Sequence, residues 1–213
     1  DYSIIEHFTK LFARCRVKVL VVGGGGREHA IIKKIKQNAE VHKIYALPGN
    51  GGISEDAECV NIGAKDIDGI VRFAVENNVD YAIVAPDPLV LGAVDALEAQ
   101  GIACFGPRAN AAIIEGSKAF AKQLMKKYGI PTAQYEIFND VEAALKYVKT
   151  APIPTVIKAD GLALGKGVII ANTRDEAVAA IKSMMQDKAF GKSGDCIVIE
   201  EFLTGPEVSV LAF

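Results

Sequence analysis

Two lysines and three glycines lie close together in Val156–Ile170, between two runs of β-branched residues. Glycine has no Cβ and tolerates positive φ, so a glycine-rich turn lets backbone N–H groups approach phosphate oxygens. Lys158 and Lys166 would add the positive charge that a polyphosphate needs. The pattern favours a phosphate-binding loop between two strands. The alternative is a β-hairpin whose glycines only form the turn and whose lysines are solvated.

The P-loop pattern does not fit this segment or any other in the chain. A Walker A loop reads G-x-x-x-x-G-K-[ST] and opens a helix. Here three residues, not four, separate the first two glycines, and Lys166 is followed by Gly167 and a strand-like run. Gly191-Lys192-Ser193 offers a second G-K-S, but Gln186 stands where the first glycine should be. We therefore reject both P-loop interpretations.

A second glycine-rich segment, Gly23-Gly-Gly-Gly-Arg-Glu-His29, follows an apolar run and opens a helix, whose N-terminus can bind an anion. Backbone N–H groups and Arg27 would hold a phosphate there. A dinucleotide loop would need glycine where Glu28 stands and an acidic residue after the second strand, which ends in Leu47-Pro48. A sugar phosphate therefore fits better than NAD or FAD. The alternatives are a turn that serves only the backbone and a His29 that packs on the helix face.

Two further segments carry charges that suit a nucleotide. Lys118 follows the helix cap Ser117, so its charge opposes the positive end of the helix dipole unless an anion binds there. Glu200-Glu201-Phe202-Leu203 ends an apolar strand, and Glu207 follows a Gly-Pro turn. Backbone groups of that strand end could bond an adenine edge, and Glu207 could take ribose hydroxyls. The simpler alternatives are a solvated lysine and a charged strand end.

Composition limits the classes of function. The 213 residues are 50% hydrophobic and 23% charged, an ordinary globular balance, and a net charge of −2 offers no basic face to DNA or RNA. The four cysteines, at 15, 59, 104 and 196, lack metal-ligand spacing and are predicted to be free thiols. No apolar run approaches the roughly 20 residues that span a bilayer. We expect a cytoplasmic protein without nucleic-acid or membrane partners; the sequence does not determine its oligomeric state, for which we take a monomer.

Strands and helices alternate along the first half of the chain. Strands are predicted at 17–22, 43–47 and 81–84, and helices at 27–37, 66–77 and 89–99. This alternation predicts an α/β fold with a doubly wound parallel sheet. Its ligands should sit at the carboxyl ends of the strands, which carry the turn-rich residues 23–27, 48–52, 86–88 and 106–107.

The second half is predicted to be a separate α+β module. Ser117 caps a helix that ends at Gly129. Beyond it we predict a strand at 134–138, a helix at 141–149, the hairpin described above, a helix from a capping box at 173–176 to 186, and a strand at 196–199. The expected domains are 17–116 and 117–213, with a smaller lid subdomain at about 132–203. Residues 1–16 fit neither, and we expect them to be a non-native leader upstream of a Val17 initiator.

Taken together, these segments resemble the glycinamide ribonucleotide synthetase (phosphoribosylamine–glycine ligase) family of the ATP-grasp superfamily. The similarity runs in one order from Val17 to Phe213. It is carried by Val-Val-Gly-Gly-Gly-Gly-Arg-Glu-His-Ala, Pro-Gly-Asn-Gly-Gly, Phe-Gly-Pro, Glu-Gly-Ser-Lys-Ala-Phe, Ile-Lys-Ala-Asp-Gly-Leu-Ala-Leu-Gly-Lys-Gly-Val and Ile-Glu-Glu-Phe-Leu-Thr-Gly-Pro-Glu. The resemblance implies a pre-ATP-grasp domain with a doubly wound sheet, followed by an incomplete α+β ATP-grasp domain.

The resemblance also implies roles for individual residues. The catalytic residues, Lys118 and Lys158, would contact ATP phosphates beneath a mobile loop that includes Gly165, Lys166 and Gly167. Adenine would be held by Glu200, Glu201 and Leu203, and the ribose by Glu207. Phosphoribosylamine would face residues of the first domain, namely Gly25, Gly26, Arg27, Glu28, His29, Pro48, Gly49, Asn50, Asp87 and Pro88. Ala85-Pro86-Asp87-Pro88-Leu89 is one residue shorter than the family's usual Pro-Glu/Asp-x-Pro-Leu.

The implied reaction joins glycine to 5-phosphoribosylamine through a glycyl phosphate, with ATP and Mg²⁺ (or Mn²⁺), in purine biosynthesis. No protein nucleophile is needed, because positioning and neutralisation of phosphate charge suffice. We expect no metal ligand in this chain, since those of the family lie beyond Phe213. The chain has roughly half the length expected for the family, so we expect a fragment without synthetase activity of its own.

Two other interpretations stay open. One is another ATP-grasp carboxylate–amine ligase or carboxylase, such as a biotin-carboxylase-like or aminoimidazole ribonucleotide carboxylase enzyme. The other is a non-catalytic nucleotide-binding module. The Gly-Gly-Arg-Glu-His and Ala-Asp-Gly-Leu-Ala sequences favour the glycinamide enzyme.

Overall fold

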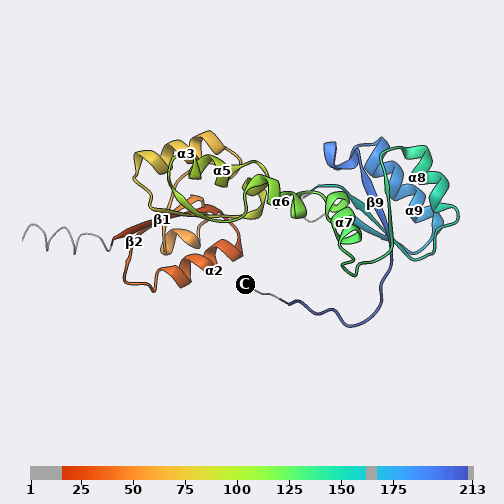
Figure 1. Cartoon of the computed structure of the whole chain (residues 1–213), viewed down its shortest axis with the longest axis horizontal. Coiled ribbons are helices and arrows are strands. Elements are labelled where there is room, and N and C mark those ends of the chain that lie inside the picture. The colour runs from red at the N-terminus through yellow and green to blue at the C-terminus, as the bar shows by residue number, and fades with distance from the viewer. Residues whose placement is uncertain (1–15, 162–166, 211–213) are drawn as a thin grey trace, which may run out of the picture. The chain divides into compact units, whose positions relative to one another are not determined.

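The computed structural model describes residues 16–161 and 167–210, apart from the side chains of Pro86 and Asp87, and contains two compact units (Figure 1). The first unit extends to Ala112 and the second begins at Ile113. The division falls within the helix α6 (Ala109–Gly116). Each unit has its own sheet; the first unit has an apolar core on each face of its sheet, and the second has one core among its described residues.

The sheet of the first unit contains five parallel strands in the order β3-β2-β1-β4-β5. They are β1 (Val17–Gly23), β2 (Val41–Pro48), β3 (Glu58–Cys59), β4 (Tyr81–Val84) and β5 (Ala103–Phe105). The central strand β1 pairs with β2 on one side and β4 on the other. The predicted parallel sheet is confirmed. The edge strand β3 was not predicted, because two residues are too few to show a periodicity. For β5 only the turn that follows it, at 106–107, was predicted, without bounds for the strand.

Helices cover both faces of this sheet, as Figure 1 shows for α2 on one side and for α3 and α5 on the other. The elements are α2 (Gly26–Ile35), the 3₁₀ turn η1 (Ile53–Glu55), α3 (Ile67–Glu76), α4 (Pro86–Val90) and α5 (Ala93–Glu98). Side chains of β1 alternate between the two cores, since successive residues of a strand point to opposite faces. Leu20 and Val22 join the core that contains Leu97, whereas Val21 joins the core that contains Ile32. The expected double winding is therefore present.

The single helix predicted at 89–99 is wrong, because the structure has two shorter helices there. Gly92 lies between them with φ +83°, a left-handed conformation that glycine adopts without strain and that a continuous helix cannot contain. The first of the two begins earlier than predicted, at Pro86, since proline is tolerated in the first turn of a helix. The helix cap predicted at Asp66 is confirmed: the Asp66 side chain accepts from Gly69 N at 3.0 Å, and α3 begins at the next residue.

The sheet of the second unit is antiparallel, with the order β6-β9-β7-β8. Its strands are β6 (Tyr135–Phe138), β7 (Thr155–Ala159), β8 (Val168–Ala171) and β9 (Ile197–Glu201). Its helices are α7 (Lys118–Lys127), α8 (Val141–Val148) and α9 (Arg174–Ile181), followed by a π-helical turn (Lys182–Gln186) and a 3₁₀ turn (Gly191–Gly194). The α+β prediction is confirmed, although β9 extends to Glu201 because that residue still pairs with Thr155 of β7.

The two faces of this antiparallel sheet differ. One face packs on α8 and α9 through buried residues such as Ile157, Ile181 and Ile199. The other face bears two cross-strand rows, Tyr135–Glu200–Val156–Ile170 and Ile137–Val198–Lys158–Val168. Within the second unit, Figure 1 shows α7 and the pair α8 and α9 on opposite sides of β9. Val168 and Ile170 are 45% and 50% exposed, so the β7–β8 part of this face, termed the open face below, is accessible.

Helix caps of the second unit follow the sequence closely. Ser117 Oγ accepts from Phe120 N at 3.0 Å and begins α7. Thr173 Oγ1 accepts from Glu176 N at 3.2 Å and begins α9. The reciprocal bond of the predicted capping box is displaced by one residue, since Glu176 Oε2 accepts from Asn172 N rather than from the cap itself.

Candidate functional site

Lys118 lies against the end of strand β7, although it belongs to the first turn of α7. Its Nζ donates to Ala159 O at 3.0 Å and to Gly161 O at 2.5 Å. These bonds hold the ammonium group at the beginning of the glycine-rich loop that leads to β8. Two segments more than 40 residues apart thus bring two predicted site residues, Lys118 and Lys158, to the same hairpin.

The electrostatics of Lys118 indicate a site that favours an anion. Burial lowers the pKa of Lys118, Asp160 opposes this shift, and the positive charge of Lys158 adds to it. The ammonium is therefore partly desolvated and close enough to a second cation to feel its field. A bound polyphosphate would offset both the desolvation of the Lys118 ammonium and its repulsion from Lys158.

Asp160 is a charged residue of this site that the sequence analysis did not identify. Its Oδ1 accepts from Ala119 N at 3.1 Å, and its carboxylate also accepts from Ser117 Oγ at 3.0 Å. A negative charge thus already lies at the N-terminus of α7, where the sequence suggested that only a bound anion would offset Lys118. The signal was present in the sequence, because this is the carboxylate next to Lys158-Ala159 in the loop.

A buried carboxylate connects two lysines on the same side of the sheet. Glu200 is 5% exposed, and its Oε2 lies 3.0 Å from both Lys158 Nζ and Lys122 Nζ. Its Oε1 is buried and has no hydrogen-bond partner among the described residues. Lys122 was not predicted to belong to the site. It stands four residues after Lys118, and residues at that spacing share one face of a helix.

The hairpin itself is confirmed where the structure describes it. Strands β7 and β8 pair antiparallel, and Ala159 N donates to Gly167 O at 2.8 Å. Gly161 has φ +113°, and a Cβ there would lie 2.6 Å from Ser193 Oγ, so a side chain cannot be accommodated. The Gly-Lys-Ser sequence rejected as a P-loop therefore forms a short turn that packs on the loop. Of the predicted loop residues, Gly165 and Lys166 lie outside the described residues.

The predicted adenine and ribose residues do not all lie together. Glu201 is fixed to the segment before β6, since its Oε1 accepts from Gln134 N at 2.9 Å and its N–H donates to Gln134 O at 3.0 Å. Leu203 is 64% exposed and Glu207 is also exposed. The structure brings together Lys118, Lys158 and Glu200, and it shows no hydrogen bond from Glu207 to that cluster within the described chain.

In the first unit, the predicted loops after β1 and β2 lie side by side and are joined by Asn50. The Asn50 amide donates to Gly24 O at 2.8 Å and accepts from Ile53 N at 2.9 Å. Gly49 N also donates to Gly23 O, at 3.2 Å. The side chain of Asn50, predicted to face the sugar phosphate, thus binds the two loops to each other.

Three of the four consecutive glycines are explained by packing. A Cβ at Gly23 or Gly25 would lie within 2.7 Å of the Glu28 side chain, and one at Gly24 would lie 2.6 Å from Gly49 O. Gly26 is different, because nothing lies within 4 Å of the position of its Cβ. The fold therefore requires the first three glycines, whereas Gly26 leaves open space at the start of α2.

Glu28 is directed into its own helix rather than towards a ligand. Its Oε2 accepts from Gly25 N at 2.6 Å, and the residue is 8% exposed. The carboxylate takes one backbone donor of the predicted phosphate site and adds a negative charge beside it. The exposed Arg27 lies next in sequence and can offset that charge.

His29 contacts a carboxylate of the 3₁₀ region. Its Nε2 lies 3.2 Å from Asp56 Oδ2, and the same carboxylate pairs with Lys33 at 3.1 Å and Lys36 at 3.0 Å. Lys36, Lys33 and His29, in that order, hold the pKa of Asp56 well below its usual range. His29 thus has a partner within the first unit, and its predicted contact with the sugar phosphate stays a prediction. Asp56 was not predicted.

The last part of the predicted sugar-phosphate site lies in α4. Pro88 is buried in the first turn of that helix, and the backbone of Asp87 is helical. The prediction for the Asp87 carboxylate falls on a side chain outside the described residues. Backbone pairing brings Ala85 next to the first loop, since Ala85 N donates to Val22 O at 3.1 Å.

Metal, membrane and thiol features complete the description. Within residues 16–161 and 167–210, no three His, Cys, Asp or Glu side chains are grouped so as to hold a metal ion. None of the helices described is both long and apolar enough to cross a membrane. Cys59, Cys104 and Cys196 are free thiols, and burial raises the pKa of Cys104 and Cys196 to about 11; Cys15 lies outside the described residues.

Comparison with solved structures defines the class of protein. Phosphoribosylamine–glycine ligase from Thermotoga maritima superimposes with a TM-score of 0.73 at 30% identity, over 89% of this chain and 45% of that one. The biotin carboxylase domain of Hydrogenobacter thermophilus 2-oxoglutarate carboxylase gives 0.69 at 24% identity, over 87% of this chain and 44% of that one, which shows a shared fold only. A parallel-sheet unit followed by this antiparallel unit is the arrangement of ATP-grasp proteins, and the second unit matches the description "Phosphoribosylglycinamide synthetase, ATP-grasp (A) domain" over residues 116–213.

The first unit matches "Phosphoribosylglycinamide synthetase, N domain" over residues 17–115. The chain therefore belongs to the phosphoribosylglycinamide synthetase family, of which it carries the N domain and ATP-grasp sequence. Phosphoribosylamine–glycine ligases from Caldanaerobacter subterraneus and Halalkalibacterium halodurans are 52% and 48% identical over 198 residues, or 92% of this chain. The chain spans 48% and 46% of those two relatives, about half their length.

Proposed function

We propose that this chain contributes the nucleotide-binding lysines and the sugar-phosphate loops of an ATP-dependent phosphoribosylamine–glycine ligase in purine biosynthesis. The observation that carries the proposal is the convergence of Lys118 and Lys158 at the β7–β8 hairpin, beside the accessible apolar surface of the open face. Two cations next to an apolar surface match the two parts of a nucleotide, a polyphosphate and a base.

Charge neutralisation is the chemistry that these lysines can supply. In the proposed reaction a glycine carboxylate oxygen forms a bond to the γ-phosphorus of ATP, and the bond from that phosphorus to ADP breaks. The amine of 5-phosphoribosylamine then attacks the acyl carbon of glycyl phosphate, phosphate leaves, and the nitrogen loses a proton. Lys118 and Lys158 would stabilise negative charge on the transferred phosphoryl group, so no protein nucleophile is required.

The adenine would rest on the open face. Val156 and Ile170 lie opposite each other there, and Glu200 continues the same cross-strand row. Beyond β9, backbone groups of Glu201 and Leu203 would meet the base edge, and Glu207 would approach the ribose. The loop with Gly165, Lys166 and Gly167 would cover the phosphates.

The sugar phosphate would bind in the first unit, next to Gly26. The N–H groups at the start of α2, the exposed Arg27 and the open space beside Gly26 would together bind the phosphate there. The loop with Pro48, Gly49 and Asn50 would form its second wall, and Asp87 and Pro88 its third. The Asn50 bonds keep the first two walls together before any ligand arrives.

We further propose Mg²⁺ or Mn²⁺ as the metal that accompanies ATP, and a monomer in the cytoplasm. Three scattered free cysteines suit a reducing compartment. A metal supplies further neutralisation of phosphate charge. The described side chains do not group as metal ligands, so no step of the reaction is assigned here to a metal held by this chain.

A chimera tests the proposal, because the chain spans about half of its relatives. Residues 17–213 would be joined to the remaining C-terminal part of the Caldanaerobacter subterraneus ligase. Glycine-dependent ADP release would then be measured with ATP, Mg²⁺ and 5-phosphoribosylamine generated in situ. We expect turnover from the chimera and none from the 213-residue chain alone.

Two matched variants test whether turnover of the chimera depends on Lys158. Lys158→Met should abolish turnover, whereas Lys146→Met, an exposed lysine of α8 on the far side of the sheet, should not. ADP release that requires bicarbonate instead of glycine would favour a carboxylase. Nucleotide binding without turnover in the chimera would favour a non-catalytic module. Turnover that survives Lys158→Met would contradict the proposed role of the lysine.

A further inference from the structure

Glu200 is shared by two lysines whose surroundings differ. Lys122 Nζ and Lys158 Nζ lie at the same distance, 3.0 Å, from the same oxygen, Oε2. The Lys122 side chain is only 10% exposed, whereas the Lys158 side chain is 27% exposed. One carboxylate cannot fully neutralise two ammonium groups, so one of the two pairs can be given up.

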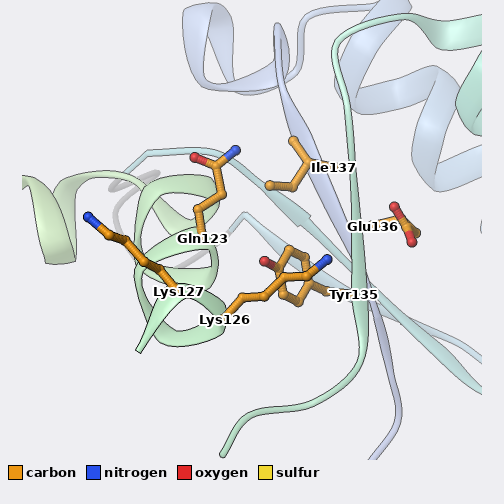
Figure 2. A pocket seen from close by; sticks show the side chains of 6 residues that line it. All are labelled: Gln123, Lys126, Lys127, Tyr135, Glu136 and Ile137. Atoms are coloured by element: carbon orange, nitrogen blue, oxygen red, sulfur yellow. The ribbon is translucent and has the colours of Figure 1, made fainter. Parts of the chain in front are cut away.

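Lys122 is the more firmly held of the pair. Its Nζ also donates to Thr132 Oγ1 at 2.7 Å and lies 5.6 Å from the centre of the Tyr135 ring. Tyr135 also lines a pocket of about 410 Å³ between α7 and β6, towards which Tyr135 and Ile137 point while Glu136 points away (Figure 2). A hydroxyl, an aromatic ring and the carboxylate thus fix Lys122 on three sides.

The side-chain Nζ of Lys158 has Glu200 as its only hydrogen-bond partner within the described residues. It lies on β7, at the base of the hairpin, and it would have to leave or share Glu200 to contact a phosphate. Breaking a buried ion pair by removing one partner is costly, because it leaves an uncompensated charge. Lys122 removes that cost, because it stays paired with Glu200 when Lys158 leaves.

We propose that Lys122 is a positioning residue: it remains the counterion of Glu200 when Lys158 turns to the ATP phosphates. This inference rests on the proposed function of Lys158. Lys122 itself contacts no substrate; it acts through Glu200 by keeping the buried carboxylate neutralised. Without Lys122, Lys158 would be the sole counterion and would be withheld from the nucleotide.

Isothermal titration of the 213-residue chain with ATP and with adenosine tests this inference. Lys122→Met should weaken ATP binding by about 10-fold, corresponding to the loss of one favourable ion pair. Adenosine has no phosphate, so its affinity should stay unchanged. Lys126→Met, one turn further along α7 and exposed, is the matched control and should change neither affinity.

The double variant Lys122→Met/Glu200→Gln separates positioning from damage to the fold. It removes the buried carboxylate together with its counterion, so Lys158 is released and ATP affinity should recover most of the 10-fold loss. Lys122→Arg should keep the affinity close to that of the parent chain. An equal loss for ATP and adenosine, or no recovery in the double variant, would overturn the inference.

A measurement without nucleotide distinguishes failure of this inference from failure of the proposed function. Acetylation by acetic anhydride, followed by mass spectrometry, reports how available the amine of each lysine is for reaction. In Lys122→Met, acetylation of Lys158 should be on the order of 10-fold slower, because Lys158 Nζ would then be the sole partner of the buried Glu200 carboxylate and would be held more firmly. If no variant binds ATP, the proposed function is contradicted and the acetylation rate decides the inference; an unchanged rate overturns it.

Discussion

The two units build their glycine-rich loops with different forces. In the first unit, Asn50 joins two loops through neutral hydrogen bonds, and close packing explains Gly23, Gly24 and Gly25. In the second unit, the hairpin and α7 are joined by charged groups, among them Lys118 on two carbonyl oxygens and Asp160 on the helix N-terminus. Neutral bonds fix a shape regardless of salt, whereas a cluster of charges also prepares a field that a charged ligand can use.

Because of this contrast, a glycine-rich loop has a different structural role in each unit. Glycines of the first unit mostly accommodate neighbouring side chains and backbone, so the loop is complete without a ligand. The lysine cluster of the second unit has an excess of positive charge, and Glu200 Oε1 is buried without a hydrogen-bond partner in the described part of the chain. Four perturbations, with expected effects from large to small, test the contrast.

The largest effect is expected from Lys118→Met in the second unit. The variant loses a charged donor, worth about 1.5–3 kcal/mol per bond, so ATP affinity should fall about 100-fold. Binding of ribose 5-phosphate to the first unit should stay the same. Isothermal titration with both ligands measures this, with Lys146→Met as the control. If Lys118 served only to hold the hairpin, thermal stability would fall while ATP affinity per folded molecule stayed constant.

The next effect is expected from Asn50→Ala in the first unit. One exposed and one part-buried hydrogen bond are lost, and their partners are left without the amide, so the free energy of unfolding should fall by about 2 kcal/mol. Asn50→Asp keeps the acceptor for Ile53 N and loses the donor to Gly24 O, so it should be intermediate. Urea unfolding with a probe in each unit would show the change in the first unit alone. Equal loss of stability in both units would contradict the separate cores.

Gly26→Ala should separate ligand binding from stability. No atom lies within 4 Å of the new Cβ, so the free energy of unfolding should change by less than about 1 kcal/mol. The methyl group would occupy the proposed phosphate position, and ribose 5-phosphate affinity should fall about 10-fold. Gly24→Ala is the contrasting variant, because its Cβ would lie 2.6 Å from Gly49 O and should destabilise the unit. If Gly26→Ala left the affinity for ribose 5-phosphate unchanged, the phosphate would not bind at the start of α2.

The smallest effect is expected at Asp56 and appears as a pH dependence. Because the folded pKa of Asp56 lies below its unfolded value of about 3.9, its ion pairs stabilise the fold above that pH and are lost as the pH falls towards the folded pKa. Asp56→Asn should therefore be slightly less stable at pH 7 and should show a flatter decrease in thermal stability below about pH 4. If thermal stability decreased equally below about pH 4 in the parent chain and in Asp56→Asn, Asp56 would not control this decrease.

Much of the fold could be predicted from the sequence, and the exceptions have physical causes. Periodic apolar runs and caps such as Asp66 and Ser117 fix strands and helices locally, and these predictions are confirmed. The division of residues 86–98 into two helices depended on Gly92 taking a left-handed conformation, which a helix-like pattern does not reveal. The short edge strand β3 depends on pairing with β2 and has no local signal, and β5, which pairs with β4, was indicated only by the turn at 106–107.

The candidate site could be predicted only in part. The lysines Lys118 and Lys158 carry their own signal, which is charge placed beside glycine or a helix cap. The partners Lys122 and Asp56 do not, because a charged residue on a helix or in a loop is usually solvated. Asp160 did carry a signal, since it directly follows Lys158-Ala159. Glu28 and Asn50 had the right types for ligand contact, yet the structure shows the Glu28 carboxylate bonded within its own loop and the Asn50 amide bonded to the loop after β1.

The sequence by itself determined the class of elements, their order and the presence of two phosphate-compatible loops, because these properties depend on local pattern and on glycine chemistry. Only the tertiary structure decided which charged groups share Glu200, which glycines are required by packing and which one faces open space. The sharing of Glu200 and the contact of Gly24 with Gly49 depend on residues tens of positions apart, and the contacts of Gly23 and Gly25 depend on the side-chain direction of Glu28. The Val156–Ile170 segment shows both: its glycines and lysines mark a loop, but α7 and β9 decide where the charges lie.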